Sequence, residues 1–600
     1  MLPKILDLAS LRDLYGAGRL TPLDLAEAIA DRMAAYPDKA VYITPVSREA
    51  LRAAAADLMA RHPEPNSLPL WGVPFGVKDN IDVAGLPTTA ACPAFAYEAV
   101  ADAHVVARLR AAGALVTGKA NLDQFATGLN GTRSPYGAPR SVFSPDHVSG
   151  GSSSGSAVAV AAGLASFALG TDTAGSGRVP AAFNNIVGIK PTPGRLGTTG
   201  LVPACRSLDC ITVFSATVAD GLAVRRLAEG PDPADPYSRP IRSVALPSAP
   251  RVGVLAGEDR EFFGDTETAR LYDEAVARLG ALGATAIPFD YAPFREIAAL
   301  LYDGPWVAER LAAVEAFFAD HAADLDPSVR AIIGSARNYS AADAFRGAYA
   351  LEALRQRTQA TFTAVDLLLL PTAPTTYTVA EMLAEPVRLN SRFGHYTNFT
   401  NLLGLAAIAV PAGLRRDGLP AGVTLIGPGS SDDALAPLAD ALHRGAGTGM
   451  GIETGAAIAG KPLPRAPRAA IPLVVVGAHL SGLPLNPELK RLGATLVRES
   501  RTAADYRLYA LPGTEPPKPG LVREPGFGGP GIAVEIWALE PEAFGRFVAE
   551  IPAPLGIGKI ALADGSRVSG FLCEAHAVAG AQEVTGYGGW RAYSAALAKG

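Results

Sequence analysis

Two clusters of small, hydroxyl-bearing residues flank one apolar segment, and they hold the residue types that acyl transfer needs. Residues 150–156 read Gly-Gly-Ser-Ser-Ser-Gly-Ser and residues 170–177 read Gly-Thr-Asp-Thr-Ala-Gly-Ser-Gly. Two such loops joined by one helix suit a serine nucleophile and its proton carrier. Small residues also let backbone N–H groups approach a reacting carbonyl, as an oxyanion hole requires. A single Gly/Ser-rich stretch is, by contrast, typical of a linker.

A serine hydroxyl is a weak nucleophile and needs a base. The histidine nearest in sequence is His147, which we expect to be a loop or packing residue, although a histidine from elsewhere in the fold stays possible. Lys78 follows the apolar residues 73–77. Desolvation there would lower the pKa of the lysine and make the neutral amine available as a base. Taken alone, Lys78 would be interpreted as a surface lysine.

The glycine and serine clusters closely resemble the amidase signature family, which uses a Ser–cis-Ser–Lys triad. The resemblance covers residues 150–153 and 170–176, with Lys78 in the expected Lys-Asp pair. It implies that Ser176 is the nucleophile, Ser152 the bridging serine and Lys78 the base. It also implies an oxyanion hole built from the backbone N–H groups of Thr173, Ala174, Gly175 and Ser176. Asp172 and Arg178 are expected to order this loop.

Residues 301–310, Leu-Tyr-Asp-Gly-Pro-Trp-Val-Ala-Glu-Arg, resemble the allophanate hydrolase branch of that family. The resemblance implies that Tyr302 and Arg310 hold the substrate carboxylate. An arginine fork binds a carboxylate through two hydrogen bonds, and a phenol adds one donor. Spacing alone would favour a surface salt bridge for Arg310. Gly128 and Asn130 lie in a Gly/Asn-rich loop, residues 128–137, and are weaker substrate-binding candidates.

Residues 474–486 resemble the C-terminal domain of the same branch, in which a strand runs into a Gly-Ala-His-Leu-Ser-Gly turn. The resemblance implies that this domain decarboxylates the product of the first domain, with His479 as a catalytic residue. A histidine can transfer a proton near neutral pH. The alternative is that His479 is a structural turn residue. The roles of Glu535 and His576 are left open.

The activity that the resemblance implies is hydrolysis of urea-1-carboxylate (allophanate) to ammonia and carbon dioxide, without a metal or an organic cofactor. One alternative is an amidase for another small carboxylated amide, such as malonamate, with a C-terminal domain used only in assembly. A second alternative is the glutaminase component of a transamidosome. A pathway link to urea carboxylase, or instead to cyanurate or triazine breakdown, is not decided by the sequence.

The helices and strands that must position these residues are predicted to form an α/β domain followed by a β-rich domain. Strand-like and helix-like segments alternate in the first part, which favours a layered domain. Helices are predicted at residues 5–35, 105–113 and 157–163 and over most of 265–360. Residues 70–83 are predicted to form a strand, a turn and a second strand. Further strands are predicted at residues 114–118, 166–170, 366–372, 405–411, 421–428, 471–477, 495–497, 506–511, 533–539 and 559–562.

We therefore predict an amidase-signature domain over residues 1–452, with a mixed, largely parallel sheet covered by helices. An Ala-, Gly- and Pro-rich linker follows over residues 453–470. Residues 471–600 are predicted to form a smaller β-rich α+β domain like the γ-glutamylcyclotransferase fold.

Composition narrows the class of protein. The chain has 600 residues and a net charge of −5, which argues against a nucleic-acid partner. Its four cysteines are scattered and form no CxxC pair, as expected in a reducing cytoplasm. Neither a signal peptide nor a membrane span is expected. We expect a cytoplasmic homodimer that acts on a small molecule.

Overall fold

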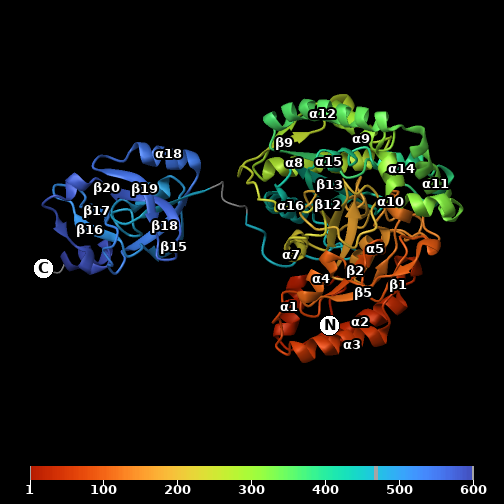
Figure 1. Ribbon diagram of the computed structural model, residues 1–600, viewed down its shortest axis with the longest axis horizontal. Helices are drawn as coiled ribbons and strands as arrows, with labels where there is room; N and C mark the ends of the chain where they lie inside the picture. The colour runs from red at the N-terminus through yellow and green to blue at the C-terminus, as the bar shows by residue number, and fades with distance from the viewer. Residues whose placement is uncertain (1, 465–469, 598–600) are drawn as a thin grey trace. The chain divides into compact units, whose positions relative to one another are not determined.

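The computed structural model describes residues 2–464 and 470–597, and the chain packs as two compact units (Figure 1). The first unit spans Met1–Arg465 and the second Ala466–Gly600. Residues 465–469 of the predicted linker lie outside the described residues. Among the described residues, no helix combines the length and apolar character needed to cross a membrane.

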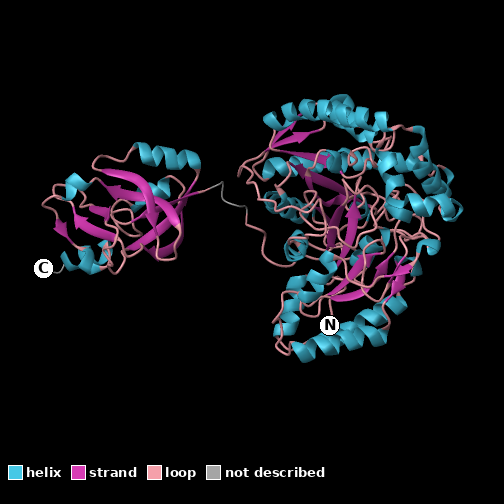
Figure 2. Cartoon of the chain, viewed as in Figure 1, coloured by secondary structure: helices cyan, strands magenta, loops and turns pink. Residues whose placement is uncertain are grey.

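One sheet of 11 strands forms the centre of the first unit, inside a covering of helices (Figure 2). In spatial order its strands are β1 (Tyr42–Pro45), β5 (Leu115–Ala120), β2 (Pro74–Lys78), β6 (Phe167–Asp172), β8 (Cys210–Ser215), β7 (Val187–Lys190), β12 (Ala406–Leu414), β13 (Pro420–Gly427), β11 (Leu367–Pro371), β9 (Arg251–Val254) and β10 (Thr285–Pro288). The fold class is confirmed, and the sheet is mixed as predicted. It is not largely parallel, however, because only the β5–β2, β2–β6, β11–β9 and β9–β10 neighbours run parallel.

The α-helices of the first unit are separated by turns and long loops. They are α1 (Leu8–Gly16), α2 (Pro22–Ala35), α3 (Arg48–Arg61), α4 (His104–Ala111), α5 (Ser154–Ala161), α6 (Val179–Phe183), α7 (Val218–Ala228), α8 (Thr266–Ala281), α9 (Ala292–Leu300), α10 (Trp306–His321), α11 (Pro327–Gly334), α12 (Ala341–Ala364), α13 (Val379–Ala384), α14 (Arg388–Phe393), α15 (Phe399–Leu402) and α16 (Asp432–Ala446). Helices α1 and α2 confirm the helical prediction for the first 35 residues. Residues 265–360 are mostly helical, but β10 interrupts them.

Strand direction explains how the sheet positions the chemistry. The strands β2 and β6 pair in parallel, with Phe75 opposite Phe167 and Val77 opposite Leu169. Their carboxyl ends therefore meet at one edge of the sheet, the edge at which α/β folds commonly place ligands. Helix α5 is buried along its whole length and leads into β6. Its small Ala and Ser side chains let it lie close to the sheet.

The second unit has a five-stranded sheet and a three-stranded sheet. The first has the order β15 (Thr495–Arg501), β18 (Ala533–Leu539), β14 (Ile471–Val475), β20 (Arg567–Cys573) and β19 (Leu555–Ala561), and the second has the order β17 (Pro519–Arg523), β16 (Tyr506–Ala510) and β21 (Gln582–Glu583). Helices α17 (Asn486–Arg491), α18 (Pro541–Ala549) and α19 (Trp590–Leu597) complete it. The β-rich character predicted for this domain is confirmed, whereas the γ-glutamylcyclotransferase likeness stays a prediction.

Candidate active site

Lys78 ends strand β2 and is completely buried. Its Nζ donates hydrogen bonds to Oγ of Ser152 at 2.8 Å and to Oγ1 of Thr171 at 2.6 Å. The peptide bond between Gly151 and Ser152 is cis. The structure thus brings Lys78 and Ser152 together, and it adds Thr171, which the sequence did not single out.

Burial lowers the pKa of Lys78 from its usual 10.5 to about 7. Desolvation disfavours the ammonium form, and it prevails over the opposing field of three carboxylates, those of Asp123, Asp209 and Asp172. Near neutral pH a large fraction of Lys78 is therefore a neutral amine. Such an amine can accept a proton from the hydroxyl that it contacts.

Ser176 lies in the loop between β6 and α6 and is 1 % exposed. Its Oγ donates a hydrogen bond of 3.4 Å to the carbonyl of Gly128. Within the described residues, the backbone N–H groups of Thr173, Ala174, Gly175 and Ser176 have no acceptor. Unpaired buried amides are rare. These four donors are therefore available to a ligand oxygen.

Gly175 cannot be replaced without disturbing this loop. Its φ is +150°, and an added Cβ would lie 2.4 Å from Oγ1 of Thr397. Asp172, at the start of the loop, holds it in place, because its carboxylate forms a fully buried ion pair with Arg178 at 2.9 Å. Burial would raise the pKa of Asp172, but the charge and hydrogen bonds of Arg178 lower it below its usual value. The pair orders the loop, as expected from the sequence.

Gly128 and Asn130 sit in a loop that Asp123 organises. The buried carboxylate of Asp123 accepts hydrogen bonds from the backbone N–H groups of Asn130, Gly131 and Arg133 at 3.0–3.2 Å. The side chain of Asn130 is already engaged by Asn390 and Thr132. Gly128 contacts Ser176, whereas Asn130 supports the loop. Asp123 was missed by sequence reasoning, since its partners are backbone groups.

Arg310 and Tyr302 lie together, as predicted, and close to the same loop. The guanidinium of Arg310 donates to the Tyr302 hydroxyl and to Oγ1 of Thr127, both at 3.1 Å. It also stands 5.0 Å from the centre of the Tyr302 ring. Arg310 is 2 % exposed, and within the described residues its guanidinium has hydroxyl partners and no ion pair. A buried guanidinium without a carboxylate partner is suited to an anionic ligand.

Asp209 is a second residue that the sequence did not indicate. Its carboxylate accepts a hydrogen bond from the hydroxyl of Thr173 and another from the backbone of Ala204 at 2.8 Å. Burial raises the pKa of Asp209 to about 6. The residue ties the start of the candidate oxyanion loop to the turn that precedes β8.

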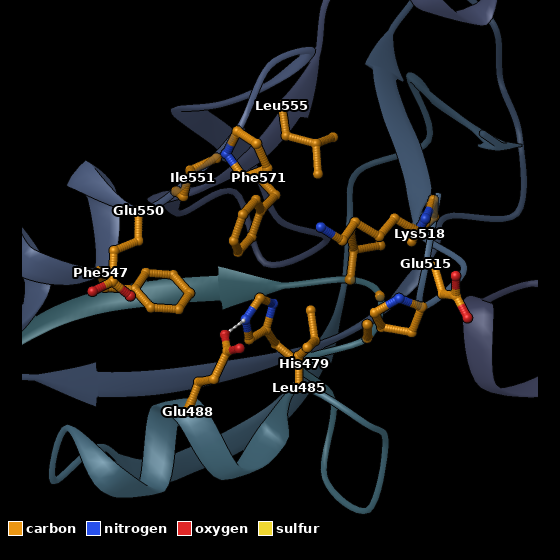
Figure 3. Close-up of a pocket in the computed structure, with 16 residues that line it drawn as sticks. His479, Leu485, Glu488, Glu515, Lys518, Phe547, Glu550, Ile551, Leu555 and Phe571 are labelled. Carbon is orange, nitrogen blue, oxygen red and sulfur yellow. Dashed lines mark hydrogen bonds and ion pairs between the residues drawn. The ribbon is translucent and has the colours of Figure 1, made fainter. Parts of the chain in front are cut away.

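His479 lines a cavity of about 320 Å³ in the second unit (Figure 3). Its Nε2 pairs with Oε2 of Glu488 at 3.0 Å, and its ring stacks on Phe571 and meets the edge of Phe547. Burial lowers the pKa of His479, although Glu488 acts in the opposite direction. The imidazole is therefore mainly neutral at pH 7.

Glu535 and His576 do not line this cavity. The buried carboxylate of Glu535 accepts hydrogen bonds from Ser481, Trp537 and Arg591, at 2.7–3.0 Å. These contacts make it a structural link between the His479 loop and α19. The side chain of His576 is 75 % exposed and pairs with Glu574. In the described part of the chain, no group of three or more His, Cys, Asp or Glu side chains could hold a metal ion.

The two sites differ in the chemistry they offer. The first combines a hydroxyl, a second hydroxyl bonded to an amine of depressed pKa, and unpaired amides. Such a combination suits nucleophilic attack on a carbonyl with stabilisation of the oxyanion. The second combines an imidazole with an apolar wall, which suits proton transfer in a poorly hydrated pocket.

Comparison with protein families gives matches in both units. Residues 24–436 match the family described as amidase, and residues 471–595 match the family described as allophanate hydrolase C-terminal domain. The chain is 44 % identical to urea amidolyase of Saccharomyces cerevisiae over 96 % of its own length and 32 % of that protein. It spans about a third of the length of the urea amidolyases that it matches.

Other relatives are matched along their length. The chain is 36 % identical to a glutamyl-tRNA(Gln) amidotransferase component of Roseiflexus castenholzii over 73 % of its own length and 95 % of that protein. Among solved structures, the Kluyveromyces lactis allophanate hydrolase matches with a TM-score of 0.82 and 40 % identity, over 99 % of both chains.

Proposed function

The chain belongs to the amidase family and carries an allophanate hydrolase C-terminal domain, and from this premise we propose that it hydrolyses allophanate to ammonia and carbon dioxide. The observation that carries the substrate assignment is Arg310, a buried guanidinium bonded to Tyr302 and to Thr127, beside the loop that contacts Ser176. Allophanate has an amide to be cleaved and a carboxylate to be held. Likeness to the K. lactis enzyme over both chains supports the same substrate.

In the proposed first step, neutral Lys78 accepts the proton of Ser152 as Ser152 accepts that of Ser176. Ser176 Oγ then forms a bond to the terminal carbonyl carbon of allophanate. The N–H groups of residues 173–176 stabilise the oxyanion. The proton held by Lys78 returns through Ser152 to the leaving nitrogen, and the C–N bond breaks with release of ammonia. Water next attacks the acyl-enzyme and releases N-carboxycarbamate, by the same proton path in reverse.

We further propose that the second unit completes the reaction at His479. N-carboxycarbamate carries two carboxylates on one nitrogen. Cleavage of one C–N bond releases carbon dioxide and leaves the electron pair on nitrogen, which takes up a proton from the imidazolium form of His479; solvent then reprotonates the imidazole. The product is carbamate, which breaks down to ammonia and carbon dioxide.

Ammonia release from a panel of substrates tests the proposal. The wild-type protein should release ammonia from allophanate faster than from malonamate, biuret or urea. Arg310→Ala should raise the KM for allophanate by about 30-fold or more, because a charge-assisted clamp is removed. Activity on biuret, which is uncharged, should fall far less.

Equal losses of activity on charged and neutral amides would show that Arg310 stabilises the fold and does not bind the substrate carboxylate. Faster turnover of malonamate than of allophanate would favour the alternative amidase, whose substrate offers the same amide and carboxylate. The homodimer, the cytoplasmic location and the pathway link to urea carboxylase stay predictions.

A further inference from the structure

The His479 cavity contains a second charged group that the proposed decarboxylation does not yet use. Lys518 lies in the segment before strand β17 and lines the cavity. Figure 3 shows its side chain extending inward, with the ammonium directed toward Phe571 and the imidazole of His479. Within residues 470–597, its Nζ has no hydrogen-bond or ion-pair partner.

The other charged groups of the cavity leave Lys518 as its cationic centre. Glu488 is bonded to His479. Glu515 and Glu550 are exposed, and in Figure 3 the carboxylate of Glu515 is directed away from the cavity. The ammonium of Lys518 is near enough to His479 to lower the pKa of the imidazole, in the same direction as burial. A free ammonium facing a neutral imidazole favours an anion between them.

Part of the cavity wall is apolar. Phe547, Phe571, Ile551 and Leu555 form it, and the rings of Phe547 and Phe571 meet edge to face at 5.7 Å. A carboxylate placed against this wall loses hydration, and none of the four side chains that form the wall can donate a hydrogen bond to it. Loss of carbon dioxide removes that charge, so the apolar wall favours the decarboxylation of the group lying against it.

We propose that Lys518 binds the carboxylate of N-carboxycarbamate that is retained, and so orients the other carboxylate against the apolar wall. This inference rests on the proposed function of the second unit. The bond between nitrogen and the wall-facing carboxyl carbon breaks, carbon dioxide leaves, and the nitrogen takes a proton from the imidazolium form of His479, which solvent then restores. The retained carboxylate stays paired with Lys518 as carbamate. The reverse orientation would stabilise the leaving carboxylate and slow its loss.

Carbon-13 NMR of the full-length protein with labelled allophanate tests this assignment, because it follows N-carboxycarbamate directly. Lys518→Met and Lys518→Gln should each slow the decay of the intermediate by about tenfold or more, since a charge-assisted contact is lost. Lys518→Arg, which keeps the charge, should retain most of the wild-type rate. Release of the first ammonia should be unchanged in all three, which also reports correct folding of the first unit.

Lys490→Met is the matched control. Lys490 is an exposed lysine of α17, outside the cavity, and its loss should not change the decay rate. If the Lys518 variants clear the intermediate at the wild-type rate while His479→Ala does not, the assignment of Lys518 is wrong and the proposed function stands. If His479→Ala also clears it at the wild-type rate, the decarboxylation step itself is wrong and this inference fails with it.

Discussion

At the scale of single residues, the decisive feature is a lysine whose charge is suppressed where a base is needed. Lys78 is completely buried and bonded to Ser152, and its pKa is lowered to about 7 mainly by desolvation. A solvent-exposed lysine would be protonated at this pH and could not act as a base. The burial of Lys78 at the end of a central strand lowers its pKa enough for the neutral amine to be present near pH 7. The amine is still basic enough to accept a proton from Ser152.

The pH dependence of kcat/KM should follow this pKa. Because the neutral amine is the active form and is lost as pH falls, kcat/KM for ammonia release should level off above about pH 7 and fall about tenfold per unit below it. Lys78→Arg keeps the charge but cannot deprotonate near neutral pH, so it should be inactive. Lys39→Arg, an exposed control, should keep the wild-type profile. A profile that stays flat from pH 5.5 to 8.5 would show that Lys78 is not the base.

The sequence indicated some of these residues and not others, for a physical reason. Ser152, Ser176 and Lys78 stand in local patterns of small and apolar residues that can be read directly. Thr171 and Asp209 have no such local pattern. Threonine is common within strands and aspartate is common just before a strand, so neither residue stands out in the sequence. Their hydrogen bonds to Lys78 and Thr173 exist only once separate strands are paired.

At the scale of elements, the loop between β6 and α6 is held by what surrounds it. The Asp172–Arg178 pair lies beneath it, and Arg178 reaches Thr397 and Thr400 near α15. Asp209 holds the hydroxyl of Thr173. With these anchors the amides of residues 173–176 keep a fixed direction without being paired among themselves. Fixed donors of this kind need no reorganisation when charge develops on the substrate.

Gly175→Ala tests the loop geometry. The added methyl would clash with Thr397 and displace the amides, so kcat should fall by about 100-fold or more, as when an oxyanion-hole donor is lost. Gly404→Ala is the matched control, because Gly404 has a φ of +69° and open space around its Cβ position. Gly404→Ala should lower the free energy of unfolding by about 1–2 kcal/mol and leave kcat unchanged. Comparable kcat for the two variants would contradict the role given to this loop.

Element types were predictable, but strand directions were not. Alternating apolar and helical segments placed β5, β6, β11, β12 and β13 within a few residues of their observed bounds. The same pattern suggested parallel pairing, since strand–helix–strand units usually produce it. In the structure β8, β7, β12 and β13 are antiparallel to their neighbours. Helix α5 also begins at Ser154 rather than at residue 157. The prediction started it too late because serines at the start of a helix resemble loop residues.

At the scale of the whole molecule, the proposed chemistry is divided between two units with separate cores. The residues proposed for amide cleavage all precede residue 311, and the His479 cavity is built entirely from residues 476–571. The sequence predicted two domains joined by a linker over residues 453–470, because that segment is rich in Ala, Gly and Pro. It could not predict the cavity, because Phe547, Phe571 and Lys518 are distant in the chain and ordinary in type.

Removal of the second unit should separate the two steps. A truncated chain ending at residue 464 should still release the first ammonia from allophanate and should accumulate N-carboxycarbamate, which then decays at its uncatalysed rate. His479→Ala in the full chain should give the same accumulation with the second unit present. Carbon-13 NMR follows the intermediate in both. Equal decay with the wild-type, truncated and His479→Ala proteins would leave the second unit with a stabilising or assembly role.

The rate of ammonia release from allophanate by Ser176→Ala tests the central claim most directly, because only Ser176 is proposed to form the acyl-enzyme. Ser156→Ala is the matched control: this buried serine of α5 donates a hydrogen bond of 2.9 Å to the carbonyl of Leu169 and has no part in the proposed reaction. We expect Ser176→Ala to keep the fold and to lose activity by about 1,000-fold or more, while Ser156→Ala stays near the wild-type rate. Activity of folded Ser176→Ala above about one per cent of wild type would contradict the account.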